Sequence, residues 1–216
     1  LAATNPMALL NFTDDSSKVF RFIGNVKVDY TLPFFKDITA TVNAGLDYSN
    51  GKGDKIIDPK MPTATTGFAG STNTYNNKAT NKLFDAYVNY MKDIKDTHSI
   101  GLMLGHSYQS FEFDDNSTQH DYFVNPSDNK HIPNINKSKN VLMSFFGRAN
   151  YGYKDRYLLT ATLRADASSK LNPDDRWGYF PSVALAWNVS NENFLKDNKT
   201  LNELKLRFGY GEVGNV

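Results

Sequence analysis

The sequence contains no cysteine among its 216 residues, which excludes disulfide scaffolds, thiolate metal sites and cysteine nucleophiles. It also lacks an excess of either charge, since 24 Lys and Arg residues balance 23 Asp and Glu residues to a formal net charge of +1. Nucleic-acid-binding proteins have a basic excess, so we expect no nucleic acid partner. The longest apolar run, 183–187, is far shorter than the about 20 residues that a membrane-spanning helix needs.

Aromatic residues are abundant instead, at 13% of the chain, although the mean hydropathy is −0.52. This combination favours β-strands with two differing faces. In the first such segment, Phe20, Phe22, Val26 and Val28 alternate with polar residues, as expected of a half-exposed strand. The same alternation predicts eight strands, at 20–32, 38–48, 83–90, 100–109, 141–153, 157–166, 177–189 and 204–211.

The lengths of the predicted connections alternate, and this pattern is typical of one kind of β protein. Outer-membrane barrels have short periplasmic turns at one end of the strands and longer extracellular loops at the other. We therefore predict an all-β fold, an antiparallel transmembrane β-barrel. Short links are expected at 33–37, 92–96 and 154–155, a medium one at 191–202, a shorter polar one at 168–175, and long polar loops at 49–78 and 114–139.

A water-soluble sandwich or a lipocalin-like barrel also has alternating strands, with the apolar face as its core. The opposite face argues against that alternative, because its charged and amide side chains suit a polar lumen. A turn centred on residue 155 pairs residues whose numbers sum to 310, which sets Arg148 opposite Thr162 and Asn150 opposite Thr160. The candidates for lumen-facing residues are Asn43, Arg148, Asn150, Arg164, Asp166, Lys205 and Arg207.

Aromatic side chains gather near the predicted strand ends, on the apolar parity. Barrels in outer membranes carry girdles of such residues at both membrane interfaces. The interface candidates are Tyr151, Tyr153, Tyr157, Trp177 and Tyr179.

Metal-binding and catalytic patterns are weak. No two of the four histidines, at 98, 106, 120 and 131, have a short metal-ligand spacing, so we predict no histidine metal site. The oxygen-rich cluster in the second long loop, consisting of Asp114, Asp115, Asn116 and Asp121, lacks the spacing and glycine of an EF-hand, and we favour a solvated loop over a Ca²⁺ site.

We expect no cofactor and no enzymatic activity. A nucleophile elbow is missing, and the Gly-Tyr-Gly-Glu-Val-Gly segment at 209–214 lies in a predicted strand rather than before a helix, which excludes a dinucleotide fingerprint.

Four segments in the last third resemble the SusC/RagA family of TonB-dependent outer-membrane transporters. They are LMSFFGRANYGY at 142–153, KDRYLLTATLRADASS at 154–169, RWGYFPSVALAW at 176–187 and LKLRFGYGEVGN at 204–215. The resemblance implies a tight periplasmic turn at Tyr-Lys-Asp-Arg-Tyr and re-entry into the membrane at Arg-Trp-Gly-Tyr-Phe-Pro-Ser, which agrees with the alternation of links.

The resemblance also implies a function. Such proteins import oligosaccharides or peptides, with a SusD-like surface lipoprotein as a lid and with energy supplied through TonB, in the outer membrane of a Gram-negative bacterium. The expected partners are then that lipoprotein, TonB, the substrate and membrane lipid. Loop residues Phe68, Tyr75, Tyr122 and Phe123 are the candidates for contact with substrate or lid.

The chain is short for such a transporter. At about 27 residues per strand, a 22-stranded barrel needs roughly 600 residues. We therefore expect residues 1–216 to be an internal section of the barrel, without signal peptide, TonB box or plug domain. A self-contained eight-stranded porin or structural barrel, whose last strand pairs with its first, is the alternative. An outer-membrane enzyme with a Ser or His at the rim is a further one.

Overall fold

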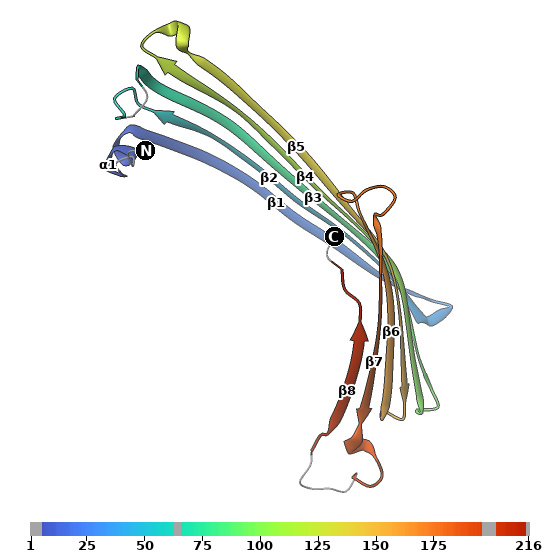
Figure 1. Ribbon diagram of the computed structural model, residues 1–216. Coiled ribbons are helices and arrows are strands. Elements are labelled where there is room, and N and C mark those ends of the chain that lie inside the picture. Colours follow the sequence, from blue (N-terminus) through green and yellow to red (C-terminus); the bar gives the residue numbers. More distant parts are fainter. Residues whose placement is uncertain (1–5, 63–65, 196–201, 215–216) are drawn as a thin grey trace. The chain divides into compact units, whose positions relative to one another are not determined.

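The computed structural model describes residues 6–62, 66–195 and 202–214, and the fold is all-β as predicted. Figure 1 shows the strands following one another in chain order, with little helix. No helix in the described residues is long and apolar enough to cross a membrane. The elements are α1 (Pro6–Phe12), β1 (Thr13–Leu32), β2 (Phe35–Ile57), β3 (Phe68–Ile94), β4 (His98–Phe123), η1 (Pro126–Asp128), β5 (Lys130–Tyr153), β6 (Tyr157–Ser168), β7 (Trp177–Asn188), η2 (Val189–Asn191) and β8 (Lys205–Gly211).

All eight strands belong to one sheet in the order β1-β2-β3-β4-β5-β6-β7-β8. Strands β5 to β8 pair antiparallel, and β5 and β6 have the predicted register, with Arg148 opposite Thr162 and Asn150 opposite Thr160. In the described part of the chain, β1 and β8 each pair with one neighbour only, so the sheet is open. A self-contained eight-stranded barrel, which needs β8 to pair with β1, is not what this chain forms.

Within residues 6–62, 66–195 and 202–214, no second layer covers the apolar face of the sheet. Among the described residues, the buried apolar side chains are only Ala8, Met61, Ala167 and Val189, whereas large side chains such as Leu104 and Phe208 are 70% and 72% exposed. A soluble sandwich or small barrel would bury such residues in its core. The apolar face therefore needs an apolar environment from outside the chain.

The long loops predicted at 49–78 and 114–139 are wrong. Strand β2 continues to Ile57, β3 begins at Phe68, β4 continues to Phe123 and β5 begins at Lys130. The connections that remain are 58–67 and 124–129. Both faces of these strand extensions are polar, so the alternation of apolar and polar residues that marks a half-buried strand is lost, although the backbone pairing continues.

The chain divides into two compact units. One consists of Leu1–Gly24, Leu46–Asn81 and Phe111–Lys139, and the other of Asn25–Gly45, Lys82–Ser110 and Asn140–Val216. In the first unit, pairs of polar side chains join neighbouring strands, for example Glu112 and Lys139, whose Oε1 and Nζ atoms are 2.9 Å apart. The second unit contains β6, β7 and β8 together with the parts of β1 to β5 that lie within 25–45, 82–110 and 140–153.

Two tight turns of the second unit have the same central dipeptide, Lys-Asp. Lys95 and Asp96 have φ of 53° and 51°, and Lys154 and Asp155 have φ of 52° and 51°. Positive φ at both central residues is the geometry of a type I′ hairpin turn, which matches the twist of the strands. The turns also touch each other, because Lys154 N donates to Thr97 O at 2.7 Å. The turn predicted at 154–155 is confirmed.

A carboxylate in the connection after β7 ties that connection to the β5–β6 turn. Glu192 accepts hydrogen bonds from Tyr157 Oη at 2.7 Å, from Trp187 Nε1 at 3.1 Å and from Arg156 Nη1 at 3.0 Å, and the residue is only 8% exposed. Arg156 Nη2 also donates to Asn193 Oδ1 at 2.8 Å. Donation by Tyr157 and Trp187, together with the charge of Arg156, holds the pKa of Glu192 below its usual range. We call these four residues (156, 157, 187 and 192) the Glu192 cluster.

Replacing Asp155 by Val should destabilise the full-length protein by about 1–2 kcal/mol, because a β-branched residue is strained at positive φ. Asp155→Asn should stay close to wild type, since Asn tolerates this conformation. The measurement is the urea midpoint of the full-length protein in lipid vesicles. The control is Asp174→Val, at an exposed position where φ is not positive; an equal loss in this control would mean that the turn geometry is not responsible.

Glu192→Gln should lower the unfolding midpoint of the full-length protein at pH 7, because it removes the charge that Arg156 and the two aromatic donors stabilise. The folded-state pKa of Glu192 is depressed, so its stabilisation is present above the unfolded pKa of about 4.3 and is lost as the pH falls through the folded pKa. The difference between wild type and variant should therefore shrink between pH 7 and acidic pH. A difference that is constant with pH would contradict this assignment.

Candidate functional site

Six of the seven predicted lumen-facing residues are brought to one face of the sheet by the pairing of β5 to β8. Arg148 stands opposite Thr162, which stands opposite Ser182, while Arg207 and Lys205 stand opposite Ala186 and Asn188. Directly opposed residues of neighbouring strands share a face, and so do alternate residues of one strand. This polar face of the sheet therefore carries Arg148, Asn150, Arg164, Asp166, Lys205 and Arg207.

The seventh candidate, Asn43 of β2, joins the same face through β3 and β4. Gly105 of β4 lies on the polar face, because a Cβ added there would collide with the ring of Phe146. Phe146 stands opposite Arg164, which is a residue of that face. Ser107, two residues further along β4, therefore points to the polar face as well, and it donates to Asp85, which accepts from Asn43.

A chain of hydrogen bonds crosses four strands on this face. Asn25 Nδ2 of β1 donates to Asn43 Oδ1 of β2 at 2.7 Å, and Asn43 Nδ2 donates to Asp85 Oδ2 of β3 at 3.1 Å. Ser107 Oγ of β4 donates to the other carboxylate oxygen, Asp85 Oδ1, at 2.6 Å. Both oxygens of Asp85 thus accept hydrogen bonds from neutral donors on the adjacent strands.

A second cluster lies on β5 and β6. Arg164 Nε donates to both oxygens of Asp166, at 2.7 and 2.8 Å, and Arg164 Nη2 donates to Ser144 Oγ at 2.9 Å. The guanidinium also lies over the ring of Phe146, 5.8 Å from its centroid. Nearby, Thr160 Oγ1 donates to Asn150 Oδ1 at 2.9 Å. Arg164 is thereby fixed in position and its charge is neutralised.

The remaining cations on the β5–β8 part of the polar face are not neutralised in this way. Arg148, Lys205 and Arg207 form no ion pair with any residue that the structure describes, and Arg148 and Arg207 are exposed. The β5–β8 part of the polar face therefore presents three positive charges without a carboxylate partner. Charges of this kind can hydrogen-bond the carboxylate, carbonyl or hydroxyl oxygens of a ligand or of another protein segment.

The polar face is hollowed beside Arg148 and Asn150. This hollow has a volume of about 320 Å³ and is lined by parts of β3, β4 and β5. Gly101 helps to keep it open, because a Cβ at this position would already be in contact with the Cβ of Asn150, at 3.5 Å. An arginine, an asparagine and bare backbone thus converge on one cavity.

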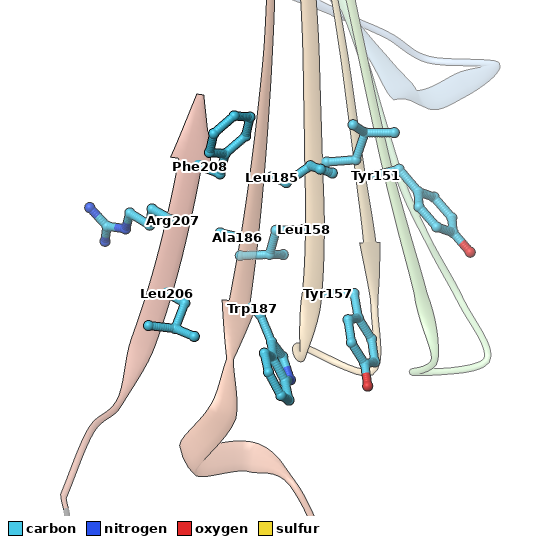
Figure 2. Close-up of a pocket in the computed structure, with 10 residues that line it drawn as sticks. Tyr151, Tyr157, Leu158, Leu185, Ala186, Trp187, Leu206, Arg207 and Phe208 are labelled. Carbon is cyan, nitrogen blue, oxygen red and sulfur yellow. The ribbon is translucent and has the colours of Figure 1, made fainter. Parts of the chain in front are cut away.

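The opposite face of β5 to β8 is apolar and carries a shallow groove (Figure 2). In Figure 2, Arg207 points away from Phe208 and Leu185. The groove lies at the end of the strands near the Glu192 cluster and measures about 420 Å³. Its apolar-face lining consists of Tyr151, Tyr157, Leu159, Leu185, Trp187, Leu206 and Phe208.

The predicted interface aromatics lie near the two ends of this apolar face. Tyr157 stacks between Tyr153 and Trp187, each at a centroid distance of 6.4 Å, and Tyr151 Oη is 2.7 Å from His98 Nδ1. Near the other end, Trp177 stacks on Phe145 at 6.1 Å, and Tyr179 is 65% exposed.

The four residues predicted to contact substrate or lid do not lie in loops. Phe68 begins β3 and Tyr75 lies within it, while Tyr122 and Phe123 end β4. Phe68 and Phe123 pack edge to face at 6.1 Å, and Thr72 Oγ1 and Tyr122 Oη are 3.3 Å apart. The predicted loop position is wrong because the strands continue into the segments that were predicted as loops.

The acidic cluster of Asp114, Asp115, Asn116 and Asp121 also lies in β4. None of the described residues forms a group of three or more metal-ligating His, Asp or Glu side chains.

Sequence reasoning missed the partners of the candidates, namely Asn25, Asp85, Ser107 and Ser144. Each lies at a polar position of the apolar–polar alternation in its predicted strand, so this alternation is the only sequence feature that indicates them. The Glu192 cluster was also missed, although Tyr157 and Trp187 carry polar tips that need acceptors near the strand ends.

Comparison with known proteins gives consistent matches. Residues 3–215 match the family model described as TonB dependent receptor-like, beta-barrel. The TonB-dependent receptor SusC of Bacteroides thetaiotaomicron is 36% identical over 215 residues, covering 97% of this chain and 21% of that protein. The TonB-dependent receptor P26 of Formosa agariphila is 31% identical over 227 residues, covering 98% of this chain and 22% of that protein.

Solved structures have the same fold. The RagAB peptide transporter matches with a TM-score of 0.83 at 23% identity, covering 94% of this chain and 23% of that one. The RagAB peptide importer in the closed-closed state matches with a TM-score of 0.81 at 24% identity, covering 93% and 23% of the two chains. The chain spans about a fifth of the length of the curated relatives it matches. With nearly all of its residues matched by the family model, the chain belongs to the TonB dependent receptor-like, beta-barrel family.

Proposed function

We propose that this chain forms eight consecutive strands in the wall of a SusC-like TonB-dependent transporter in the outer membrane of a Gram-negative bacterium. The observation that carries the proposal is the division of one sheet into an exposed apolar face and a polar face with a hydrogen-bonded network. A barrel wall in a membrane needs both, since its outer face contacts lipid and its inner face lines an aqueous lumen. Membership of the TonB-dependent receptor family supports the same assignment.

The proposed activity is import of oligosaccharides or peptides, without enzymatic chemistry and without a cofactor. The name of the RagAB peptide transporter describes peptide transport for that protein. The proposed partners are a SusD-like surface lipoprotein acting as a lid, TonB as the source of energy, and membrane lipid on the apolar face. In this arrangement Arg148, Lys205, Arg207 and the hollow beside Gly101 belong to the lumen and contact the substrate or the plug.

Deletion of the full-length gene tests the transport function. The deletion strain should lose growth on one member of a panel of oligosaccharides and oligopeptides, and a strain that lacks TonB should show the same loss. Complementation with the full-length gene should restore growth. Unchanged growth on every member of the panel, together with steady conductance of the reconstituted protein without TonB, would instead indicate a passive pore.

Substitutions that introduce a charge on the apolar face of β6 and in the polar part of β5 test which part of the sheet contacts lipid. Leu163, in the middle of β6 on the apolar face, is 55% exposed, and Ile135, in the polar part of β5, is 68% exposed. Leu163→Arg should destabilise the full-length protein in lipid vesicles by about 2–4 kcal/mol, because the cation enters the hydrocarbon region. Ile135→Arg should change stability by no more than about 0.5 kcal/mol. Equal effects in urea unfolding would contradict the proposed position of the lipid.

Filling the hollow on the polar face should impair transport without impairing assembly. Gly101→Ala should leave uptake unchanged, because its Cβ makes only ordinary contacts with Asn150, the nearest at 3.5 Å. Gly101→Trp should reduce the uptake rate several-fold, because the indole occupies the hollow beside Arg148. Uptake of the growth substrate by whole cells is the measurement, at matched amounts of folded protein in the outer membrane. Wild-type uptake by the Trp variant would remove the hollow from the substrate or plug path.

A further inference from the structure

Two histidines that are distant in sequence meet in the polar part of the sheet. His120 of β4 and His131 of β5 bring their Nδ1 atoms to 3.2 Å, with ring centroids 4.4 Å apart and planes inclined by 48°. Both residues belong to the same compact unit. Sequence analysis predicted no histidine metal site because no two histidines are closely spaced along the chain, but strand pairing creates a proximity that spacing does not reveal.

The pair is held by strands rather than by a loop. His120 and His131 have numbers that sum to 251, and so do Glu112 and Lys139, which form an ion pair between the same two strands at 2.9 Å. The same sum is expected when both pairs belong to one register in which the two histidines stand opposite each other. Directly opposed residues of antiparallel strands have their Cβ atoms about 4.5–5.5 Å apart, so both rings start from fixed positions.

The separation of the two nitrogens suits a shared metal ion. Zinc binds imidazole nitrogen at about 2.0–2.1 Å and prefers tetrahedral angles. Two nitrogens 3.2 Å apart, each about 2.05 Å from one ion, subtend an angle of about 103° at that ion. This value lies between the 90° of an octahedral and the 109° of a tetrahedral site, so the two nitrogens are spaced for one ion, and the rings turn so that both lone pairs point to it.

We propose that His120 and His131 form a two-histidine binding site for a divalent metal ion of the zinc class, which includes Zn²⁺, Ni²⁺ and Cu²⁺. Imidazole suits these ions, whereas Mg²⁺ and Ca²⁺ prefer oxygen ligands. The protein supplies the two Nδ1 atoms, and water completes the coordination, since the described residues contain no group of three or more metal-ligating side chains.

The surroundings of the pair are compatible with binding from solvent. His131 is exposed and His120 is partly exposed, so an ion can reach both rings without displacing protein atoms. The ring of Tyr122 lies beside that of His120, with planes inclined by 13° and centroids 6.4 Å apart. In the metal-free protein one ring donates its Nδ1 proton to the other. On binding, that ring carries its proton on Nε2 instead, and both Nδ1 lone pairs coordinate the ion.

The test is a Zn²⁺ titration of the full-length protein in detergent, purified through a tag without histidines and competed with a chromophoric chelator. His120→Ala and His131→Ala should each lower the affinity for one Zn²⁺ equivalent by about tenfold or more. Loss of even a residue that only hydrogen-bonds to a metal ligand costs about 10–100-fold in metal affinity. His98→Ala is the matched control, since His98 Nδ1 lies 2.7 Å from Tyr151 Oη in a different part of the sheet. It should bind Zn²⁺ like the wild type.

A spectroscopic measurement on the unmodified protein keeps the proposal testable if a variant does not fold. One equivalent of Cu²⁺ should give an electron paramagnetic resonance spectrum with hyperfine coupling to two imidazole nitrogens. A spectrum without nitrogen coupling would overturn the proposal. Zn²⁺ affinity that is unchanged in both alanine variants would overturn it as well, and neither result depends on whether the protein transports a nutrient.

Discussion

The hydrogen-bond ladder between neighbouring strands is the constraint on which the other features depend. In a membrane no water can satisfy backbone N–H and C=O groups, so each strand must pair with its neighbour over the whole span. Pairing fixes the register, and register fixes which side chains share a face. That is why Arg148 and Arg207, on strands three apart in the sheet, point to the same side, while Phe208 points to the other. A slip by one residue would exchange the faces of a strand.

The polar face shows how charges are accommodated once the register is fixed. Asp85 receives two neutral donors from the adjacent strands, and Arg164 is satisfied by Asp166 and Ser144. These groups hold one another in place and leave little unsatisfied charge. Arg148, Lys205 and Arg207, which form no ion pair with any described residue, lie on the β5–β8 part of the same face. In the proposed transporter, a ligand or a plug segment that binds there gives those cations partners without breaking the internal network.

How well the sequence predicted the structure depended on whether the two faces of a strand differ. Where they do, as around Phe145 and Arg148, the strands and even the pairing of Asn150 with Thr160 were predictable. In β2 after Tyr48 and in β4 after Phe113 both faces of the strand are polar, so the composition of these segments resembles that of a loop. The side-chain partners were not predictable, because the link from Asn43 to Asp85 spans 42 positions and depends on the order of strands. The contact between His120 and His131 has the same origin.

The polar strand extensions bear on where recognition takes place. Strand β3 has 27 residues and β4 has 26, whereas a tilted transmembrane strand needs only about 9–11. The excess cannot lie in hydrocarbon, because its outward side chains include the paired ions Glu112 and Lys139. It continues instead as paired sheet, which leaves only short connections at 58–67 and 124–129. Aromatic residues such as Phe68 and Phe123 are then held by strand pairing and by each other. In the proposed transporter, a lid or substrate that reaches this part of the molecule meets a surface already ordered by strand pairing, so binding there requires little loss of loop entropy.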